Sequence, residues 1–283
     1  MPVNDLNLSA ESANYLQTTL KEGVATITMN NPQKLNGWTR EMMDSFQEAF
    51  RKAAATEAVK AIIFTGTGRY FSAGVNLGGT LSLMSPKKLH QMIVSNNQAL
   101  FETFLDCPKP ILVAMNGPAI GASVTSATLC NGIIASEKAT FSTPFAALGI
   151  KPEGCSSIHF PRLMGEANAQ RMLGPEGWKP TAAEALEVGL VQWVVPDDQL
   201  QSEAFKIARG WVEKNEPRSF LAGSKLNELK AVNAKESVEL ADAFLSAPFF
   251  KEQARFMWRK NKKSSAAMFY TLGALRPLWG RFL

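Results

Sequence analysis

The carboxylate of Glu153 stands alone in the stretch LGIKPEGCSS (148–157), between a proline and a glycine. No second acid and no histidine accompanies it within this stretch. A glutamate at such a chain bend is ordinarily a solvated surface residue, because loops are polar and lie on the outside of a protein. If apolar neighbours such as Phe145, Leu148 and Ile150 bury the carboxyl group, its pKa rises and it can serve as a general base.

Two turns rich in small residues could supply backbone N–H groups that complement such a base. GRYFSAGVNLGG (68–79) follows the apolar run KAIIFTG, and NGPAIGAS (116–123) follows the apolar run ILVAM. Glycine and alanine after a strand let backbone N–H groups approach a ligand closely. One such turn is a weak signal, and structural glycine is its default interpretation. Two of them, each behind a buried strand, predict a pair of amides aimed at one oxygen, as in an oxyanion hole.

Short strands are predicted at regular intervals up to about residue 195. In GVATITMNNP, Ala25, Ile27 and Met29 fall on one face, which is typical of a half-buried strand. Further strands, mostly apolar, are predicted for KAIIFTG, ILVAM, GIIAS and ATFSTP. Because helical patterns alternate with these largely buried strands, the sequence predicts an α/β architecture.

Helical spacing of apolar residues predicts one helix that opens at Thr39 and another over about residues 87–105. Thr181 and Glu184 form a capping box at the start of a further helix. Beyond VQWVVPDD the chain is predicted to be helical to its end, over about 200–214, 217–232, 235–246 and 248–262.

The change of character near residue 198 predicts two regions, a core over 1–198 and a helical region over 199–283. The last twenty residues, 264–283, are apolar with scattered arginines. We expect them to pack on a neighbouring subunit, and a membrane surface is the alternative.

The composition is that of an ordinary soluble globular protein, with 283 residues, 46% hydrophobic and 19% charged. No apolar run reaches 18 residues, so no transmembrane helix is expected. Three cysteines and two histidines lack metal-ligand spacing, which predicts no metal site and suits a reducing compartment. His159, in an apolar stretch, is expected to be a core side chain with its hydrogen bonds satisfied.

The net charge of +5 admits nucleic acid or a small polyanion as a partner. No basic stripe interleaved with aromatic residues is present, so nucleic acid is not expected. The densest basic run is RKNKK (259–263), which is typical of a solvated helix face.

Four segments in a fixed order carry a resemblance to a known family. They are NNPQKLNGWT, GRYFSAGVNL, PKPILVAMNGPAIGAS and FSTPFAALGIKPEGCSS. Together they resemble the crotonase (enoyl-CoA hydratase/isomerase) superfamily over about residues 15–262. The resemblance implies a crotonase-like spiral of ββα units with a helical C-terminal region that builds a homotrimer or hexamer. It also implies an acyl-CoA thioester substrate, with coenzyme A as part of that substrate and no separate cofactor.

The resemblance implies that the thioester oxygen lies between the backbone N–H groups of Val75 and Ala122. The phosphates and adenine of coenzyme A would lie along the loops near Lys34 and Arg69, with the 259–263 segment of the same or a neighbouring subunit nearby. The implied substrate-binding set is Lys34, Arg69, Ser72, Ala73, Gly74, Asn76, Leu77, Gly121, Thr125 and Phe145.

The acidic residues indicate the sub-class. Hydratases of this family place one glutamate four residues after the glycine of the second turn and another about twenty residues later. Here the position four after Gly121 is Thr125, whereas the later region keeps Glu153. This pattern resembles the peroxisomal-type Δ3,Δ2-enoyl-CoA isomerases, which act in the β-oxidation of unsaturated fatty acids. It implies that Glu153 alone moves a proton from C2 of a 3-enoyl-CoA to C4 through a dienolate, giving the trans-2-enoyl-CoA.

Alternatives stay open, because one fold supports several chemistries. A hydratase or another crotonase-type lyase or hydrolase is the first, and a non-catalytic CoA- or RNA-binding scaffold is the second. A serine nucleophile at Ser72, Ser156 or Ser157 is disfavoured, because no histidine lies in a supporting motif. The N-terminal residues do not form a secretory signal. The final Arg-Phe-Leu departs from the serine–lysine–leucine type, so the peroxisomal matrix and the cytoplasm both remain open.

Overall fold

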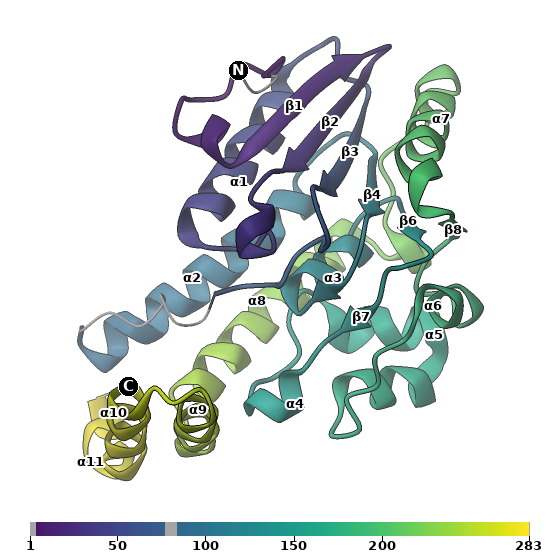
Figure 1. The fold of residues 1–283 in the computed structure, drawn as a ribbon. Helices are drawn as coiled ribbons and strands as arrows, with labels where there is room; N and C mark the ends of the chain where they lie inside the picture. The colour runs from purple at the N-terminus through teal and green to yellow at the C-terminus, as the bar shows by residue number, and fades with distance from the viewer. Residues whose placement is uncertain (1–3, 77–83, 283) are drawn as a thin grey trace.

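A twisted six-stranded sheet forms the centre of the chain, which the computed structural model describes over residues 4–76 and 84–282 (Figure 1). The strand order is β1-β2-β3-β4-β6-β8, and every neighbouring pair is parallel except β1 with β2. Two short parallel strands, β5 and β7, form a second small sheet. The strands are β1 Leu16–Lys21, β2 Val24–Met29, β3 Ala61–Gly66, β4 Ile111–Met115, β5 Ala119–Ile120, β6 Gly132–Ser136, β7 Phe141–Ser142 and β8 Trp193–Val195.

Helices cover both faces of the sheet and continue into a C-terminal group, α9 to α11, that lies apart from it (Figure 1). The helices are α1 Arg40–Ala55, α2 Pro86–Leu105, α3 Ala122–Thr128, α4 Phe145–Leu148, α5 Ser156–Leu173, α6 Ala182–Glu187, α7 Leu200–Glu213, α8 Leu226–Phe244, α9 Ala247–Arg259, α10 Lys263–Ala274 and α11 Arg276–Trp279. Short 3-10 turns occupy Ser12–Asn14, Pro32–Lys34, Asp197–Gln199, Leu221–Gly223 and Gly280–Phe282.

The two faces of the sheet bury two different cores, because side chains alternate along each strand. Ile62 and Phe64 of β3 join the main core with α1, whereas Ala61 and Ile63 join a smaller core with α7. A sheet covered on both faces explains why its strands are nearly continuous apolar runs.

An aromatic cluster lies between α1, α2 and the sheet. Phe104 of α2 is its centre, with ring centroids 5.2 Å from Phe50, 5.9 Å from Phe64, 6.1 Å from Phe46 and 6.4 Å from Trp38. All five rings are almost completely buried. The cluster therefore fixes α2, the helix that also contributes to the site described below, against the sheet.

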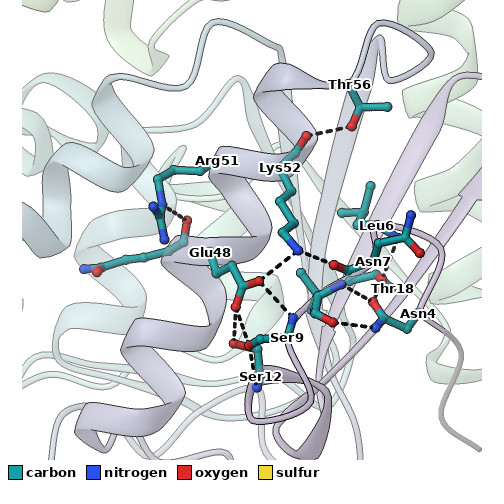
Figure 2. Close-up of polar contacts among 12 residues, drawn as sticks. Asn4, Leu6, Asn7, Ser9, Ser12, Thr18, Glu48, Arg51, Lys52 and Thr56 are labelled. Carbon is teal, nitrogen blue, oxygen red and sulfur yellow. Dashed lines mark hydrogen bonds and ion pairs between the residues drawn. The ribbon is translucent and has the colours of Figure 1, made fainter.

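The N-terminal segment is tied to α1 through one carboxylate, Glu48 (Figure 2). Glu48 accepts hydrogen bonds from the backbone and side chain of Ser9 and from the hydroxyl of Ser12, and it pairs with Lys52 at 3.0 Å. Partial burial opposes ionisation, but the hydrogen bonds from Ser12 and Ser9 prevail and lower the pKa of Glu48 to about 2. The segment before β1 is thus held on the helix that covers the main core.

Most sequence predictions of strands and helices are confirmed. The predicted apolar runs form β2, β3, β4, β6 and β7, and the predicted capping box at Thr181 and Glu184 is present. Thr39 accepts the N–H of Met42 as the cap of α1. The division of the chain near residue 198 stays a prediction, although α7, just beyond it, packs on the sheet.

The prediction of separate helices over 217–232 and 235–246 is wrong, because one helix, α8, spans 226–244. Asn233 lies within this helix despite its low helical propensity. Its side-chain amide donates to the carbonyl of Gln98 on α2 at 3.1 Å, so packing between α2 and α8 overrides local preference.

Residues 217–220 are not helical, because the half-buried side chain of Arg218 anchors them to the core. The guanidinium of Arg218 donates to the carbonyls of Cys107 at 3.2 Å, Phe104 at 3.0 Å and Leu129 at 2.6 Å. A helix starting at Pro217 would withdraw these donors and leave buried carbonyls without partners.

The apolar tail packs on its own chain along one face. Phe269 of α10 is buried against Phe250 of α9, with centroids 6.4 Å apart, and Trp279 meets the same ring at 5.7 Å. Within the described residues, no helix is long and apolar enough to cross a membrane, and no cluster of three or more acidic, histidine or cysteine side chains is arranged to bind a metal.

The aromatic cluster predicts a large effect of truncating Phe104. Phe104→Ala should lower the free energy of unfolding by about 3–5 kcal/mol, because it leaves a cavity among four rings. Phe104→Leu, the matched control, should cost only about 1 kcal/mol. Urea denaturation followed by circular dichroism measures both, and equal, small losses would contradict the central place given to this ring.

Candidate active site

Glu153 lies in a tight bend between the short helix α4 and the start of α5. Gly154 and Cys155 both have positive φ, 66° and 62°, and turn the chain directly after it. A Cβ atom on Gly154 would lie 2.4 Å from a ring carbon of Phe101 and 2.7 Å from the hydroxyl of Thr125, so only glycine fits. The bend therefore directs Glu153 inward, and its exposed fraction is 7%, which excludes a solvated loop residue.

One side chain holds the carboxyl group of Glu153. The amide nitrogen of Asn97, on α2, donates to Oε2 at 2.6 Å, and the hydroxyl of Ser237, on α8, donates to the amide oxygen of Asn97 at 2.8 Å. Burial raises the pKa of Glu153 to about 7, while the Asn97 hydrogen bond favours the charged form and the nearby carboxylate of Glu236 opposes it. A group with this pKa can accept and return a proton near neutral pH.

A second buried acid, Glu236 of α8, fixes the bend itself. Its carboxylate accepts the backbone N–H of Cys155 at 2.6 Å and that of Ser157 at 3.0 Å. Burial raises the pKa of Glu236, and these hydrogen bonds act in the opposite direction. Since each of its oxygens accepts a backbone N–H at the start of α5, Glu236 fixes the backbone that directly follows Glu153.

Asn97 and Glu236 were not identified from the sequence. Asn97 stands four residues after Ile93 and three before Leu100, so it is a polar residue on a predicted apolar stripe. That break in the stripe was the available signal. Glu236 gives no comparable signal, because its burial depends on how α8 packs on α5.

The two small-residue turns leave the sheet side by side. They follow β3 and β4, which are neighbouring parallel strands, so both turns emerge at the same edge. Ser72 pairs with Ala119 in a parallel bridge, and the N–H of Ile120 donates to the carbonyl of Ser72 at 3.1 Å. Val75 and Ala122 each stand three residues further along these two adjoining segments.

The N–H groups of Val75 and Ala122 have no acceptor among residues 4–76 and 84–282. Gly74, with φ of 79°, allows the close approach of the two turns, because a Cβ atom there would lie 2.4 Å from the carbonyl oxygen of Ile120. Gly121, with φ of 62°, precedes Ala122, the first residue of α3. The amide of Ala122 thus lies at a helix N-terminus, which favours negative charge.

The helix α3 contacts the bend that carries Glu153 and also carries one of the two amides, that of Ala122. Thr125 is fully buried on this helix, and its hydroxyl donates to the carbonyl of Ala122 at 3.3 Å. The Thr125 hydroxyl also faces Gly154, directly after Glu153. The structure therefore brings Glu153 to the helix whose first amide is Ala122.

Two small residues of the predicted binding set support the first turn from within. The hydroxyl of Ser72 is buried, donates to the carbonyl of Asn36 at 2.8 Å and accepts the N–H of Gly74 at 3.0 Å. Ala73 donates its N–H to the carbonyl of Leu35 at 2.9 Å. These contacts place Ser72 in a structural role within the turn.

Other predicted residues lie at the edges of this region. Asn76 is exposed and donates its N–H to Trp38, whereas Leu77 lies outside the described residues. Phe145 and Ile150 pack in a separate cluster with α8 and α9, so the ring beside the Glu153 bend is Phe101 instead.

Lys34 and Arg69 are both exposed on adjoining loops. The side-chain amide of Asn36 joins these loops by donating to the carbonyls of Thr67 and Tyr70, each at 2.9 Å. Two cations are thereby held on one pair of linked loops that leads into the first turn.

His159 is a core side chain, as predicted. Its ring nitrogens lie 2.9 Å from the hydroxyl of Ser224 and 3.4 Å from that of Thr128. Burial lowers the pKa of His159 to about 4, so the ring is neutral and its hydrogen bonds are satisfied within the core.

Comparison with known proteins finds one family. The family model described as enoyl-CoA hydratase/isomerase matches residues 19–263. Human enoyl-CoA delta isomerase 2 is 35% identical over 257 residues, which cover 87% of this chain and 64% of the relative. Mouse "Enoyl-CoA delta isomerase 3, peroxisomal" is 31% identical over 262 residues, covering 89% and 81%. This chain thus spans somewhat under two thirds of the length of the human relative.

A solved structure shows the same fold. The enoyl-CoA hydratase/isomerase of Pseudoalteromonas atlantica superimposes with a TM-score of 0.74 at 29% identity, covering 87% of this chain and 97% of that one. The mixed sheet and the helices around it are therefore the architecture of a crotonase-type fold, as expected.

The raised pKa of Glu153 predicts a specific pH dependence of stability. Between its ordinary value of 4.5 and about 7, the folded protein keeps a proton that the unfolded chain releases, so stability falls as pH rises through this window. The loss totals about 3 kcal/mol and is absent in Glu153→Gln. Unfolding free energies of both proteins at pH 5 and pH 8 measure it. A pH dependence equal in the two proteins would contradict the assigned pKa.

Proposed function

The chain belongs to the enoyl-CoA hydratase/isomerase family, and from this we propose that it is an acyl-CoA isomerase that converts 3-enoyl-CoA to trans-2-enoyl-CoA. The observation that carries the proposal is the buried carboxyl group of Glu153, which has a pKa of about 7 and keeps one oxygen without a hydrogen bond from a described residue. It stands beside the helix that Ala122 opens, and Thr125 occupies the place of a second acid. The names of the human and mouse relatives, which are enoyl-CoA delta isomerases, support isomerase activity.

The proposed reaction begins with proton abstraction. The thioester carbonyl acidifies the C2 hydrogens of the substrate, and the Glu153 carboxylate removes one of them. The electron pair moves onto the thioester oxygen and gives a dienolate. The N–H groups of Val75 and Ala122 donate to that oxygen, and one such donor typically lowers a barrier by about 3–4 kcal/mol.

The second step returns the same proton. The carboxylic acid form of Glu153 donates it to C4, the C2–C3 double bond forms and the thioester carbonyl is restored. Asn97 holds Oε2 throughout, while Oε1 accepts no hydrogen bond from a described residue and is the oxygen we assign to the transfer. No water is added, so one carboxyl group suffices.

The coenzyme A part of the substrate gives a role to the two cations, Lys34 and Arg69, on the linked loops beside the first turn. We assign the exposed side chains of Lys34 and Arg69 to the phosphates of coenzyme A. Coenzyme A belongs to the substrate, so no separate cofactor is proposed. A homotrimer or hexamer and a place in unsaturated fatty acid β-oxidation are part of this proposal.

Hydration of 2-enoyl-CoA is the alternative on the same scaffold, and the structural relatives include enzymes named as hydratases. It is disfavoured because the hydroxyl of Thr125 is buried and donates to the carbonyl of Ala122, leaving no second carboxylate at this position to orient a water.

Replacing the base tests the proposal directly. Glu153→Gln should lower turnover of 3-hexenoyl-CoA by about 10²–10⁴-fold, the range expected for loss of a general base. Glu166→Gln, which alters an exposed glutamate on α5, is the matched control and should keep wild-type turnover. Near-normal turnover by Glu153→Gln would rule out the assigned base. Rapid formation of 3-hydroxyacyl-CoA from 2-enoyl-CoA by the unaltered protein would favour the hydratase.

The pH profile tests how the base is held. Because the reaction needs the Glu153 carboxylate, kcat/KM for 3-hexenoyl-CoA should rise as pH passes through about 7. Asn97→Ala removes the hydrogen bond that favours the carboxylate, so the midpoint of the profile should move to higher pH. Ser237→Ala, which loosens Asn97 without removing it, should move the midpoint less. A midpoint that stays in place in Asn97→Ala would contradict this role.

A further inference from the structure

Two consecutive residues of α8, Glu236 and Ser237, hold the proposed base from opposite ends. Ser237 acts on its carboxyl group, because the serine hydroxyl donates to Asn97 and the amide of Asn97 donates to Oε2 of Glu153. Glu236 acts on its backbone, because the Glu236 carboxylate accepts two N–H groups of the bend that directly follows the base. One helix therefore supports both the bend and the carboxyl group that the bend carries.

The helix α8 is itself fixed against its neighbours at this place. Four buried residues share one of its faces at helical spacing: Leu229, Asn233, Glu236 and Ser237. The carbonyl of Leu229 accepts a hydrogen bond from the thiol of Cys155 at 3.2 Å, so α8 holds the bend through a further contact. The side chain of Asn233 donates to a carbonyl of α2. This face of α8 is thus bound to both elements that meet at the proposed base.

The two buried acids beside this face, Glu153 and Glu236, have different hydrogen-bond partners. Glu236 accepts backbone N–H groups with both oxygens, and these groups lie at the N-terminus of α5, where negative charge is favoured. Glu153 accepts one side-chain amide with Oε2, and no donor from the described residues reaches Oε1. The ionised form is therefore better supported at Glu236 than at Glu153.

A charge that stays on Glu236 changes the behaviour of Glu153. Burial is the largest cause of the raised pKa of Glu153, the Asn97 hydrogen bond opposes it, and the charge of Glu236 raises the pKa further. Acids whose environments separate their pKa values can divide two roles between them, one holding a fixed charge and one exchanging a proton. Glu236 fits the first role, and Glu153 fits the second.

The other polar groups that face these two acids in the described part of the chain are neutral or exposed. From the neighbouring elements come the amide of Asn97 on α2, the hydroxyl of Thr125 on α3 and the thiol of Cys155 before α5. Burial raises the pKa of this thiol, so it carries no charge. Glu239 on α8 also raises the pKa of Glu236, but it is exposed and lies 3.7 Å from the amine of Lys235.

We propose that Glu236 is a positioning residue for the isomerase reaction: its carboxylate clamps the bend that carries Glu153, and its negative charge makes the Glu153 carboxylate a stronger base. This inference rests on the proposed function, because it assigns a role in the proton transfer. Without the charge of Glu236, the Glu153 carboxylate would be a weaker base and would remove the C2 proton of the substrate more slowly.

Infrared titration of the folded protein tests the role of the charge. The band of the protonated Glu153 carboxyl group is identified by its absence from Glu153→Gln, and its midpoint should lie at about 7 in the unaltered protein. In Glu236→Gln, which keeps the length of the side chain, the midpoint should fall by about half a pH unit or more. Glu239→Gln, the matched control, removes an exposed charge from the same helix and should leave the midpoint in place.

A second variant tests the clamp separately from the charge. Glu236→Asp keeps the negative charge but is one methylene shorter, so it should reach the two N–H groups of the bend poorly. Its infrared midpoint should stay closer to that of the unaltered protein than the midpoint of Glu236→Gln does. Its kcat for 3-hexenoyl-CoA should fall about tenfold or more, because the base is less well placed. Circular dichroism confirms that each variant is folded.

The results that would overturn the proposal can be separated from failure of the proposed function. An unchanged or higher midpoint in Glu236→Gln would contradict the role of the charge, as would an equal fall in Glu239→Gln. If Glu236→Gln does not fold, Glu153→Gln decides, because a buried protonated carboxyl band remaining in it at about pH 6.5 would show that Glu236 is uncharged. The infrared midpoints need no turnover, so an inactive unaltered protein would reject the isomerase function by a different measurement.

Discussion

The burial of one ionisable carboxyl group is the constraint around which this molecule is organised. Glu153 can lie inside the protein only if its charge is suppressed or compensated, and both occur. Its pKa rises to about 7, and Asn97 supplies a hydrogen bond to the charged form. The group is held by α2 and α8, and the aromatic cluster that fixes α2 on the sheet therefore supports the site as well as the core. A raised pKa lowers the free energy of unfolding at neutral pH, so the environment that makes Glu153 a suitable base also destabilises the folded state.

The proposed oxyanion donors are backbone N–H groups and not side chains, so the fold alone determines their positions. Neighbouring parallel strands deliver two turns to one edge of the sheet, and the bridge between Ser72 and Ala119 sets their register. Gly74 and Gly121 permit conformations in which the amides of Val75 and Ala122 have no acceptor within the described part of the chain. Such groups are preorganised by the fold, which is what stabilisation of a developing charge requires.

Local patterns were sufficient to predict β2, β3, β4, β6 and β7 and to single out the two turns and the bend at Glu153, because hydrophobic period and glycine placement can be recognised in short segments. They did not predict β1, β5 or β8. The partners of Glu153 were not predictable in this way. Asn97 lies 56 residues away and Glu236 reaches the bend from α8, so both depend on tertiary packing. The same packing places Asn233 inside one helix, α8, where two were predicted, and it holds Arg218 on carbonyls of the core where a helix start was expected. The role assigned to the Val75 and Ala122 amides remains a prediction from resemblance and geometry.

The central claim is that the buried carboxyl group of Glu153 alone carries one proton from C2 to C4. Conversion of a 3-enoyl-CoA deuterated at C2, run in ordinary water and read by mass spectrometry and NMR at early turnover, tests this most directly. The account predicts that a substantial part of the deuterium appears at C4 of the 2-enoyl-CoA product. Product formed with only solvent hydrogen at C4 from the first turnover would contradict the transfer of that proton by Glu153 alone.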